Sequence, residues 1–290
     1  MSLFCDAISE RVLVCDGAMG TMLYSNGVFV NRSFDALNVT NPDLVQGIHR
    51  AYRLAGADVI ETNTFGANRV KLEGFGLADR LREVNLAGVR LARRAAGTGI
   101  YVAGSIGPLG VPVMPHGQTT LTEAEDYYRE QAGVLLEGNV DLFILETFRS
   151  IDDICVAIRA VRSVSELPLV AQMTTNESGH SHDGISPEEF GSRISAEGAT
   201  VVGINCGAGP AATLETVERL RDSTFLPLAA QPNAGLPRQV EGRTMYMSSP
   251  DFMASYARRF IQRGVRLVGG CCGTTPEHIR GVASVVSKGI

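Results

Sequence analysis

The stretch TVVGINCG, residues 200–207, is a short run of apolar residues that ends in a cysteine and a glycine. A continuous apolar run of this length is typical of a strand buried on both faces, as in a parallel sheet. A second run, VRLVGGCCG at 265–273, ends in an adjacent cysteine pair and again a glycine. The two stretches therefore predict parallel strands whose carboxyl ends carry thiols.

Six further runs have the same character, and helical stretches separate the eight. Eight strands alternating with helices predict an α/β fold, a (β/α)8 TIM barrel that occupies residues 1–290 as a single domain. An open, doubly wound sheet is the alternative, but no GxGxxG fingerprint follows the first strand. The six runs are VLVCD (12–16), DVIET (58–62), YVAGS (101–105), LFILE (142–146), LPLVAQM (167–173) and LPLAAQ (226–231).

Helix starts and long loops fit this arrangement. Asn41, Ser186, Ser249 and Thr275 each precede a proline, so each is a candidate cap with proline at the first helical position. Barrels keep their active sites at the carboxyl ends of the strands, where strand-to-helix loops stand. The long loops expected there are 106–121, 174–185 and 232–248.

The composition excludes several classes of function. The net charge is −5 and no basic run occurs, so we expect neither nucleic acid nor a membrane as a partner. No apolar run approaches the roughly 18 residues that cross a bilayer. Asp6 and Glu10 argue against a signal peptide, so we expect a cytoplasmic protein. Six cysteines do not make a disulfide framework in this length, and we expect no special role for Cys5, Cys15 and Cys155.

Thiols at the ends of two strands predict a zinc site. Cys206, Cys271 and Cys272 converge if their strands lie side by side. Neighbouring side chains on a strand point to opposite faces, so the adjacent pair needs a sharp turn, which the surrounding glycines allow. Three thiolates with an open fourth position are typical of catalytic Zn²⁺. Inert core cysteines or a strained vicinal disulfide are the alternatives.

Acidic residues at the same rim predict a site for an amino acid. Asp16 and Glu146 end the first and fourth strands, where they could bind a substrate ammonium group. The glycine-rich turn at 17–20 offers backbone N–H groups to a carboxylate. Helix capping or pairing with an arginine is the alternative for both acids. Together with the thiols, these groups indicate an α-amino acid that itself carries a thiol.

Two other chemistries find little support. A Schiff base needs a lysine at a strand end, and the two lysines, Lys71 and Lys288, lie elsewhere. His180 and His182 could bind a metal, but an H-x-H pair in a polar loop is more often solvated.

Seven segments, in order along essentially the whole chain, resemble the homocysteine S-methyltransferase family. The Cys…GGCC pattern is specific for that family. The resemblance implies a barrel with Zn²⁺ bound by Cys206, Cys271 and Cys272, and with Asn233 in the open position before substrate arrives. The segments are DGAMGT (16–21), ETNTFGAN (61–68), GSIGPLG (104–110), ETF (146–148), GINCGAGP (203–210), QPNAGLP (231–237) and GGCCGTTPEHI (269–279).

The resemblance also implies a reaction, in which the zinc-activated thiolate of L-homocysteine accepts a methyl group to give L-methionine. It implies no catalytic side chain beyond that thiolate. The donor stays open between S-methylmethionine and a partner protein that carries a methyl-corrinoid or methylfolate. Betaine is disfavoured because the chain has no tryptophan for an aromatic cage. A non-catalytic zinc- or thiol-binding regulatory barrel is the alternative. The implied substrate-binding residues are Asp16, Gly17, Ala18, Met19, Gly20, Thr21, Asn63, Glu146 and Thr147.

Overall fold

Short parallel strands carry the fold, and each lies within one of the predicted apolar runs or extends it by one or two residues. The structure is a computed structural model that describes residues 3–29, 31–207, 209–240 and 243–289. The parallel strands are β1 Leu13–Val14, β2 Val59–Glu61, β3 Tyr101–Ile106, β4 Leu142–Phe148, β5 Leu169–Met173, β6 Val201–Cys206, β7 Leu228–Pro232 and β10 Val265–Val268.

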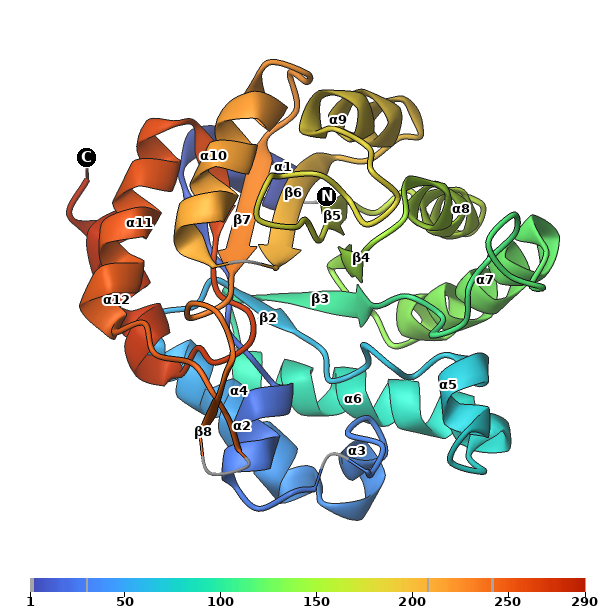
Figure 1. The fold of residues 1–290 in the computed structure, drawn as a ribbon. Helices are drawn as coiled ribbons and strands as arrows, with labels where there is room; N and C mark the ends of the chain where they lie inside the picture. Colours follow the sequence, from blue (N-terminus) through green and yellow to red (C-terminus); the bar gives the residue numbers. More distant parts are fainter. Residues whose placement is uncertain (1–2, 30, 208, 241–242, 290) are drawn as a thin grey trace.

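These strands form one eight-stranded sheet in the order β1-β10-β7-β6-β5-β4-β3-β2. Figure 1 shows the succession from β2 to β7 around the barrel. The sheet closes on itself because β1 also meets β2. The N–H of Asp58 donates to the carbonyl of Val14 over 2.7 Å, and the N–H of Asp16 donates to Val59 over 3.0 Å. The predicted (β/α)8 barrel is confirmed.

Helices surround the barrel, with at least one between each pair of consecutive barrel strands and one after the last. The predicted prolines occupy the first position of α4, α9, α11 and α12. Of the predicted caps, the hydroxyls of Ser186 and Ser249 accept backbone N–H groups three residues on. In the described residues the helices are α1 Leu3–Glu10, α2 Gly20–Ser25, α3 Leu37–Thr40, α4 Pro42–Ala55, α5 Arg69–Glu73, α6 Leu81–Ala96, α7 Leu121–Glu137, α8 Ile151–Arg162, α9 Pro187–Ala196, α10 Pro210–Arg221, α11 Pro250–Gln262 and α12 Pro276–Ser287, with a 3-10 turn at Ala78–Arg80.

The inside of the barrel has an apolar floor. Phe4 and Ile8 of α1 are 0% and 2% exposed and pack with inward side chains of the strands. The Phe4 ring stands edge-on to Tyr101, with 5.5 Å between the ring centroids. Helix α1 therefore closes the amino-terminal end. The inward side chains are Leu13, Cys15, Val59, Ala103, Leu142, Ile144, Val170, Val201, Ala229 and Leu267.

A polar layer lies above this floor. Because side chains on a strand alternate between faces, the residue two positions further on also points inward. On five strands that next residue is polar, and on β6, where it is Gly203, the following inward residue is Asn205. All six side chains make hydrogen bonds within the barrel. They are Glu61, Ser105, Glu146, Gln172, Asn205 and Gln231.

The loop between β7 and α11 contains a hairpin that the sequence did not predict. Strands β8 (Arg238–Val240) and β9 (Arg243–Met245) pair antiparallel, with Arg238 opposite Met245. Three-residue strands with mostly polar side chains lack the apolar run that marks the barrel strands.

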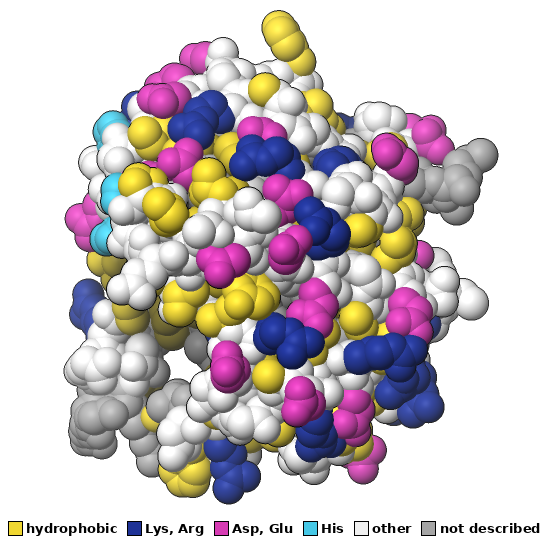
Figure 2. All heavy atoms as spheres, turned by 90° about the vertical axis from the view of Figure 1, so that its right-hand side faces the viewer, with side chains coloured by type: hydrophobic (Ala, Val, Ile, Leu, Met, Phe, Trp, Pro, Cys, Tyr) yellow, Lys and Arg dark blue, Asp and Glu magenta, His cyan; other side chains and the backbone are white. Residues whose placement is uncertain are grey.

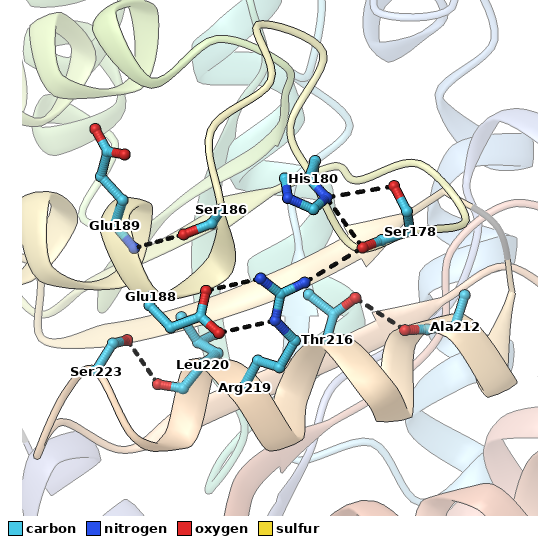
Figure 3. Close-up of polar contacts among 10 residues, drawn as sticks. All are labelled: Ser178, His180, Ser186, Glu188, Glu189, Ala212, Thr216, Arg219, Leu220 and Ser223. Atoms are coloured by element: carbon cyan, nitrogen blue, oxygen red, sulfur yellow. Dashed lines mark hydrogen bonds and ion pairs between the residues drawn. The ribbon is translucent and has the colours of Figure 1, made fainter.

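The loop between β5 and α9 is fastened to the outer helices, as Figure 3 shows. The guanidinium of Arg219 on α10 donates to the Ser178 carbonyl over 3.3 Å. It also donates to both carboxylate oxygens of Glu188 on α9, over 2.8 and 2.9 Å. His180 Nδ1 lies 3.1 Å from the same Ser178 carbonyl, so this histidine contacts its own turn.

The outer surface mixes charges of both signs. Figure 2 shows basic and acidic side chains interspersed on the face that carries α7 and α8. Arg129 pairs with Glu125 over 2.5 Å, and Arg193 pairs with Asp152 over 2.6 Å. In the part of the chain that the structure describes, no helix has both the length and the apolar character that a membrane span requires.

Candidate metal centre

Three thiols meet at the carboxyl rim of the barrel. The sulfur atoms of Cys206, Cys271 and Cys272 lie within 4.8 Å of one another. The premise that their strands are neighbours is wrong, because β7 lies between β6 and β10. Strand β7 bridges the gap instead. Its last residue, Pro232, is paired with Cys206 and accepts the N–H of Cys271 over 2.9 Å.

The backbone bends at both cysteine sites, as the pattern predicted. Cys206 has a φ of 60°, in the left-handed region that only a few non-glycine residues adopt. Gly273 follows the cysteine pair with a φ of 81°. The Thr274 N–H donates back to the Cys271 carbonyl over 3.1 Å, which closes a tight turn. This turn lets both neighbouring thiols face one point.

Hydrogen bonds among the sulfurs set their protonation. The thiols of Cys271 and Cys272 bond to Cys206 and lower the pKa of Cys206 to about 3. The same bond to Cys206 raises the pKa of Cys272 to about 12, and it raises the pKa of Cys271 well above its ordinary value. A cation bound among the sulfurs would favour the deprotonated form of all three thiols.

The three sulfurs suit Zn²⁺. Thiolates bound tetrahedrally to zinc at roughly 2.3 Å stand about 3.8 Å apart, within the spread of this cluster. Asn233 is 4% exposed, and it contacts Cys206. Its amide donates to the Gly207 carbonyl over 2.8 Å, while its Oδ1 is buried with no hydrogen-bond partner among the described residues. A buried oxygen without a partner beside three thiols is a suitable fourth ligand.

A cluster of buried carboxyl groups lies beside the thiols. Asp16 and Glu146, both predicted, converge there with Glu61, which was not. Glu146 accepts a hydrogen bond from the Ser105 hydroxyl over 2.5 Å. Glu61 accepts one from Gln231 over 2.8 Å, and its own N–H donates to Asp16 over 3.1 Å. An inward position two residues after Val59 was the signal that could have identified Glu61.

Burial dominates the protonation of these acids. It raises the pKa of Asp16 and of Glu146 well above the ordinary value. It raises the pKa of Glu61 to about 7, and the neighbouring Asp16 charge adds to the effect. The thiol of Cys15, which is buried in the barrel interior, donates to Glu61 over 3.3 Å. A cationic group bound at this cluster would favour the ionised carboxylates.

The predicted carboxylate-binding turn lies next to the thiol turn. The Thr21 hydroxyl accepts the N–H of Gly273 over 3.0 Å. The N–H of Ala18 is already used, because it donates to Thr274 over 3.1 Å. Gly17 also faces Thr274, whose Oγ1 would stand 2.6 Å from a Cβ placed there.

Free backbone donors remain at the start of α2. The first hydrogen bond of this helix runs from Leu23 N–H to the Met19 carbonyl, over 2.9 Å. The N–H groups of Gly20 and Thr21 precede that bond and have no partner within the helix. These two groups are the ones best placed to bind a carboxylate.

The remaining two predicted residues have different environments. Asn63 donates to the Phe34 carbonyl over 2.8 Å and to Asn38 Oδ1 over 3.0 Å, so its amide hydrogens tie the segment before α3 to β2. Thr147 lies beside Glu146 with a φ of 64°. Its N–H donates to Asn205 Oδ1 over 2.7 Å, at the edge of the thiol cluster.

Tyr246, directly after the hairpin, is a further residue of the site. Its ring lies against Gly273, where a Cβ would be 2.2 Å from Tyr246 Cγ. The Tyr246 hydroxyl donates a hydrogen bond to Cys272, and burial raises the pKa of that hydroxyl. Because the residue reaches the thiols only through the hairpin, no strand-end pattern indicated it.

Comparisons with known proteins agree with this geometry. The methionine synthase of Mycobacterium tuberculosis is 37% identical to this chain over 304 aligned positions, and that of Mycobacterium leprae is 35% identical. Both alignments cover 98% of this chain and 25% of the relative, so the chain spans about a quarter of the length of these proteins.

Solved structures share the fold. The homocysteine methyltransferase MmuM from Escherichia coli, in its metallated form, superposes with a TM-score of 0.82 at 24% identity, covering 98% of this chain and 99% of that one. A methyltransferase from Methanosarcina mazei has a TM-score of 0.63 at 12% identity, over 99% of this chain and 97% of that one. The sequence profile of one family, described as homocysteine S-methyltransferase, matches residues 13–286, from β1 to α12. The chain therefore belongs to the homocysteine S-methyltransferase family.

Proposed function

We propose that this chain binds Zn²⁺ through Cys206, Cys271 and Cys272 and transfers a methyl group to the sulfur of L-homocysteine, giving L-methionine. The observation that carries the proposal is the three sulfurs within 4.8 Å of one another, beside a cluster of buried carboxyl groups. The two parts match the two ends of the substrate, a thiol and an ammonium group.

The chain's own residues bind and orient the substrate. Asp16 and Glu146 accept the ammonium group, and the N–H groups of Gly20 and Thr21 accept the carboxylate. Zn²⁺, when bound, keeps the substrate thiol deprotonated at neutral pH, where a free thiol with a pKa near 8.5 is mostly protonated. Asn233, whose buried Oδ1 has no hydrogen-bond partner among the described residues, would be the fourth ligand before the substrate binds.

The reaction moves one methyl group and one electron pair. The homocysteine thiolate attacks the methyl carbon, and a carbon–sulfur bond forms as the bond between the methyl group and the donor breaks. The electron pair of the broken bond stays with the donor, and the sulfur becomes a neutral thioether. Holding the thiolate in the barrel mouth supplies orientation and removes water from it.

The methyl donor is proposed to come from outside this barrel. The relatives named methionine synthase are about four times as long as the matched region, and this chain aligns with one quarter of each. A second protein or domain that carries a methyl-corrinoid or methylfolate is therefore the favoured source. S-methylmethionine, which needs no carrier, is the other source.

The test is methionine formation by zinc-loaded protein from L-homocysteine, with one donor at a time. Turnover with S-methylmethionine alone would identify a self-sufficient enzyme, whereas turnover only with methylcobalamin or methylfolate carriers would identify a dependent one. In parallel, Co²⁺-substituted protein reports whether homocysteine sulfur reaches the metal. No turnover with any donor, and no spectral response to homocysteine, would contradict the proposal. The non-catalytic regulatory barrel would then be the remaining alternative.

A further inference from the structure

Asn205 connects the two halves of the site with one amide group. It lies on β6, directly before Cys206, and is 1% exposed. Its Oδ1 accepts the Thr147 N–H over 2.7 Å, and its Nδ2 donates to the Thr147 hydroxyl over 2.8 Å. The same Nδ2 lies 3.4 Å from Glu146 Oε2 and 3.8 Å from Cys271 Sγ.

The donor capacity of this amide is limited. An amide nitrogen carries two hydrogens, and here three acceptors surround it. One hydrogen is committed to Thr147 at the short distance, so the second is shared between Glu146 and Cys271. Glu146 is the proposed partner of the substrate's ammonium group, and Cys271 is one of the proposed ligands of the zinc ion that would bind the substrate's sulfur.

Asn205 also holds strained backbone on both sides of the site. Thr147 and Cys206 have φ values of 64° and 60°, which are unfavourable for residues other than glycine, and most of all for β-branched threonine. The paired bonds to Thr147 fix the first of these residues. The Thr174 hydroxyl donates to the Asn205 carbonyl over 3.0 Å and fixes the backbone just before the second. Strain of this kind persists only where surrounding contacts enforce it.

We propose that Asn205 is a positioning residue that sets the separation between Glu146 and Cys271 and couples ligand binding at the two ends. This inference rests on the proposed function, because it assigns the ends to one amino-acid substrate. When an ammonium group binds Glu146, it takes the place of the Asn205 hydrogen that Glu146 shares with Cys271. That hydrogen is then free to bond to the sulfur of Cys271. The fixed separation then favours homocysteine over cysteine, whose thiol stands one methylene closer to its ammonium group.

Two variants remove the donor in different ways. Asn205→Asp keeps the shape and the acceptor for Thr147 but loses the Nδ2 hydrogens, and Asn205→Ser removes the whole amide. Asn85→Asp is the matched control. Asn85 is an equally buried amide that bonds to the Ala67 and Leu81 carbonyls over 2.8 and 2.9 Å, away from the thiols.

The first readout needs no substrate. In Co²⁺-substituted protein, the thiolate-to-metal absorption bands should shift in both Asn205 variants and stay unchanged in Asn85→Asp. The second readout is the affinity for L-homocysteine, which should fall roughly ten- to a hundredfold, as expected for a lost bond to a charged group. The preference for homocysteine over cysteine should shrink with it.

The third readout measures the coupling with single-ended probes, 2-aminobutyrate for the ammonium end and propane-1-thiol for the sulfur end. In the wild-type protein each probe should tighten binding of the other, and in both variants this effect should vanish. Folded variants with unchanged metal spectra and unchanged coupling would overturn the inference. If homocysteine leaves the wild-type metal spectrum unchanged, the proposed function fails, while the probe coupling still decides the role of Asn205.

Discussion

At the scale of single residues, the site depends on side chains that are distant in sequence and converge in the barrel mouth. Cys206 belongs to β6, while Cys271 and Cys272 follow β10. Two of the three thiols have a polar neighbour that affects them, since Asn205 donates toward Cys271 and Tyr246 donates to Cys272. Such neighbours orient metal ligands and tune their electron density.

Replacing Cys271 or Cys272 by alanine should abolish zinc binding and methionine formation and leave the barrel folded. Zinc should be lost because two thiolates do not complete a site that requires three. The fold should be retained because neither side chain belongs to the apolar floor. Bound zinc, measured per folded chain by atomic absorption, should fall to background while far-ultraviolet circular dichroism is retained. Cys155→Ala, at a buried position on α8, is the control that should keep its zinc. Activity retained by either site variant would contradict the proposed function.

Tyr246→Phe should weaken zinc binding roughly tenfold, because a hydrogen bond to a residue that binds the metal contributes about that much to metal affinity. The variant removes only the hydroxyl that donates to Cys272. Competition with a chelating dye measures the change. Tyr256→Phe, on α11, is the control and should bind zinc as the wild type does. Equal affinities for all three proteins would show that the hydroxyl has no effect on the metal.

Glu61 should make the apoprotein less stable as the pH rises. Its pKa is raised from 4.5 to about 7 in the folded state, so the folded state binds more protons than the unfolded state in that window. The free energy of unfolding therefore falls between about pH 4.5 and 7, by up to about 3 kcal/mol for this group. Urea titrations should show a smaller decrease for Glu61→Gln than for the wild type. If the free energy of unfolding fell with pH as much in Glu61→Gln as in the surface control Glu73→Gln, the assignment to Glu61 would be refuted.

At the scale of secondary-structure elements, much of the architecture could be predicted from the sequence. Continuous apolar runs located all eight barrel strands, because strands covered on both faces need apolar side chains at every position. The first strand is shorter than its run 12–16, since Cys15 makes only an isolated bridge. The hairpin β8–β9 was missed because its pairing depends on local backbone contacts between mostly polar residues.

The site could be predicted only in part. The thiols and two of the three buried acids were recognisable at strand ends. Their true geometry depends on β7, which lies between the thiol-bearing strands. The predicted order of strands already places the run 226–231 there, but it does not give the contacts of Pro232 with Cys206 and Cys271. Glu61 could have been identified from the sequence, because it lies two residues after Val59 and side chains on a strand alternate between faces. The ties of Asn63 to Phe34 and of Tyr246 to Cys272 arise only when distant segments pack together.

Helix α1 should contribute to stability without affecting chemistry. Phe4 is fully buried at the amino-terminal end of the barrel, opposite the thiols. Phe4→Ala should lower the free energy of unfolding by about 3 to 4 kcal/mol through lost burial and a cavity. Urea denaturation measures the loss, and zinc content per folded chain should not change. Phe225→Ala, at a residue that is fully exposed, should stay within about 0.5 kcal/mol of the wild type.

At the scale of the whole molecule, stability and chemistry occupy opposite ends of one barrel. The apolar floor and the packed outer helices involve none of the three proposed metal ligands. The polar layer separates that floor from the rim. Loss of metal at the rim should therefore leave the overall fold in place.

Treatment with a zinc chelator should lower the melting temperature by a few degrees without unfolding the chain at 25 °C. Zinc binds the folded state, so its removal takes away only the binding contribution to stability. Thermal scans by circular dichroism, before and after chelation and again after zinc is restored, measure the effect. Unfolding at room temperature on chelation would show instead that the metal holds the barrel together.

The strand order has a consequence for the way this protein is made. Strand β1 pairs with β10, so the barrel cannot close until residue 268 has left the ribosome. Cys271 and Cys272 are synthesised just after that strand, whereas Cys206 emerges some 60 residues earlier. The segment that closes the barrel and the segment that supplies two of the three proposed zinc ligands are therefore synthesised together, near residue 270. A chain truncated before residue 271 would lack two of these ligands and should not acquire zinc at this site.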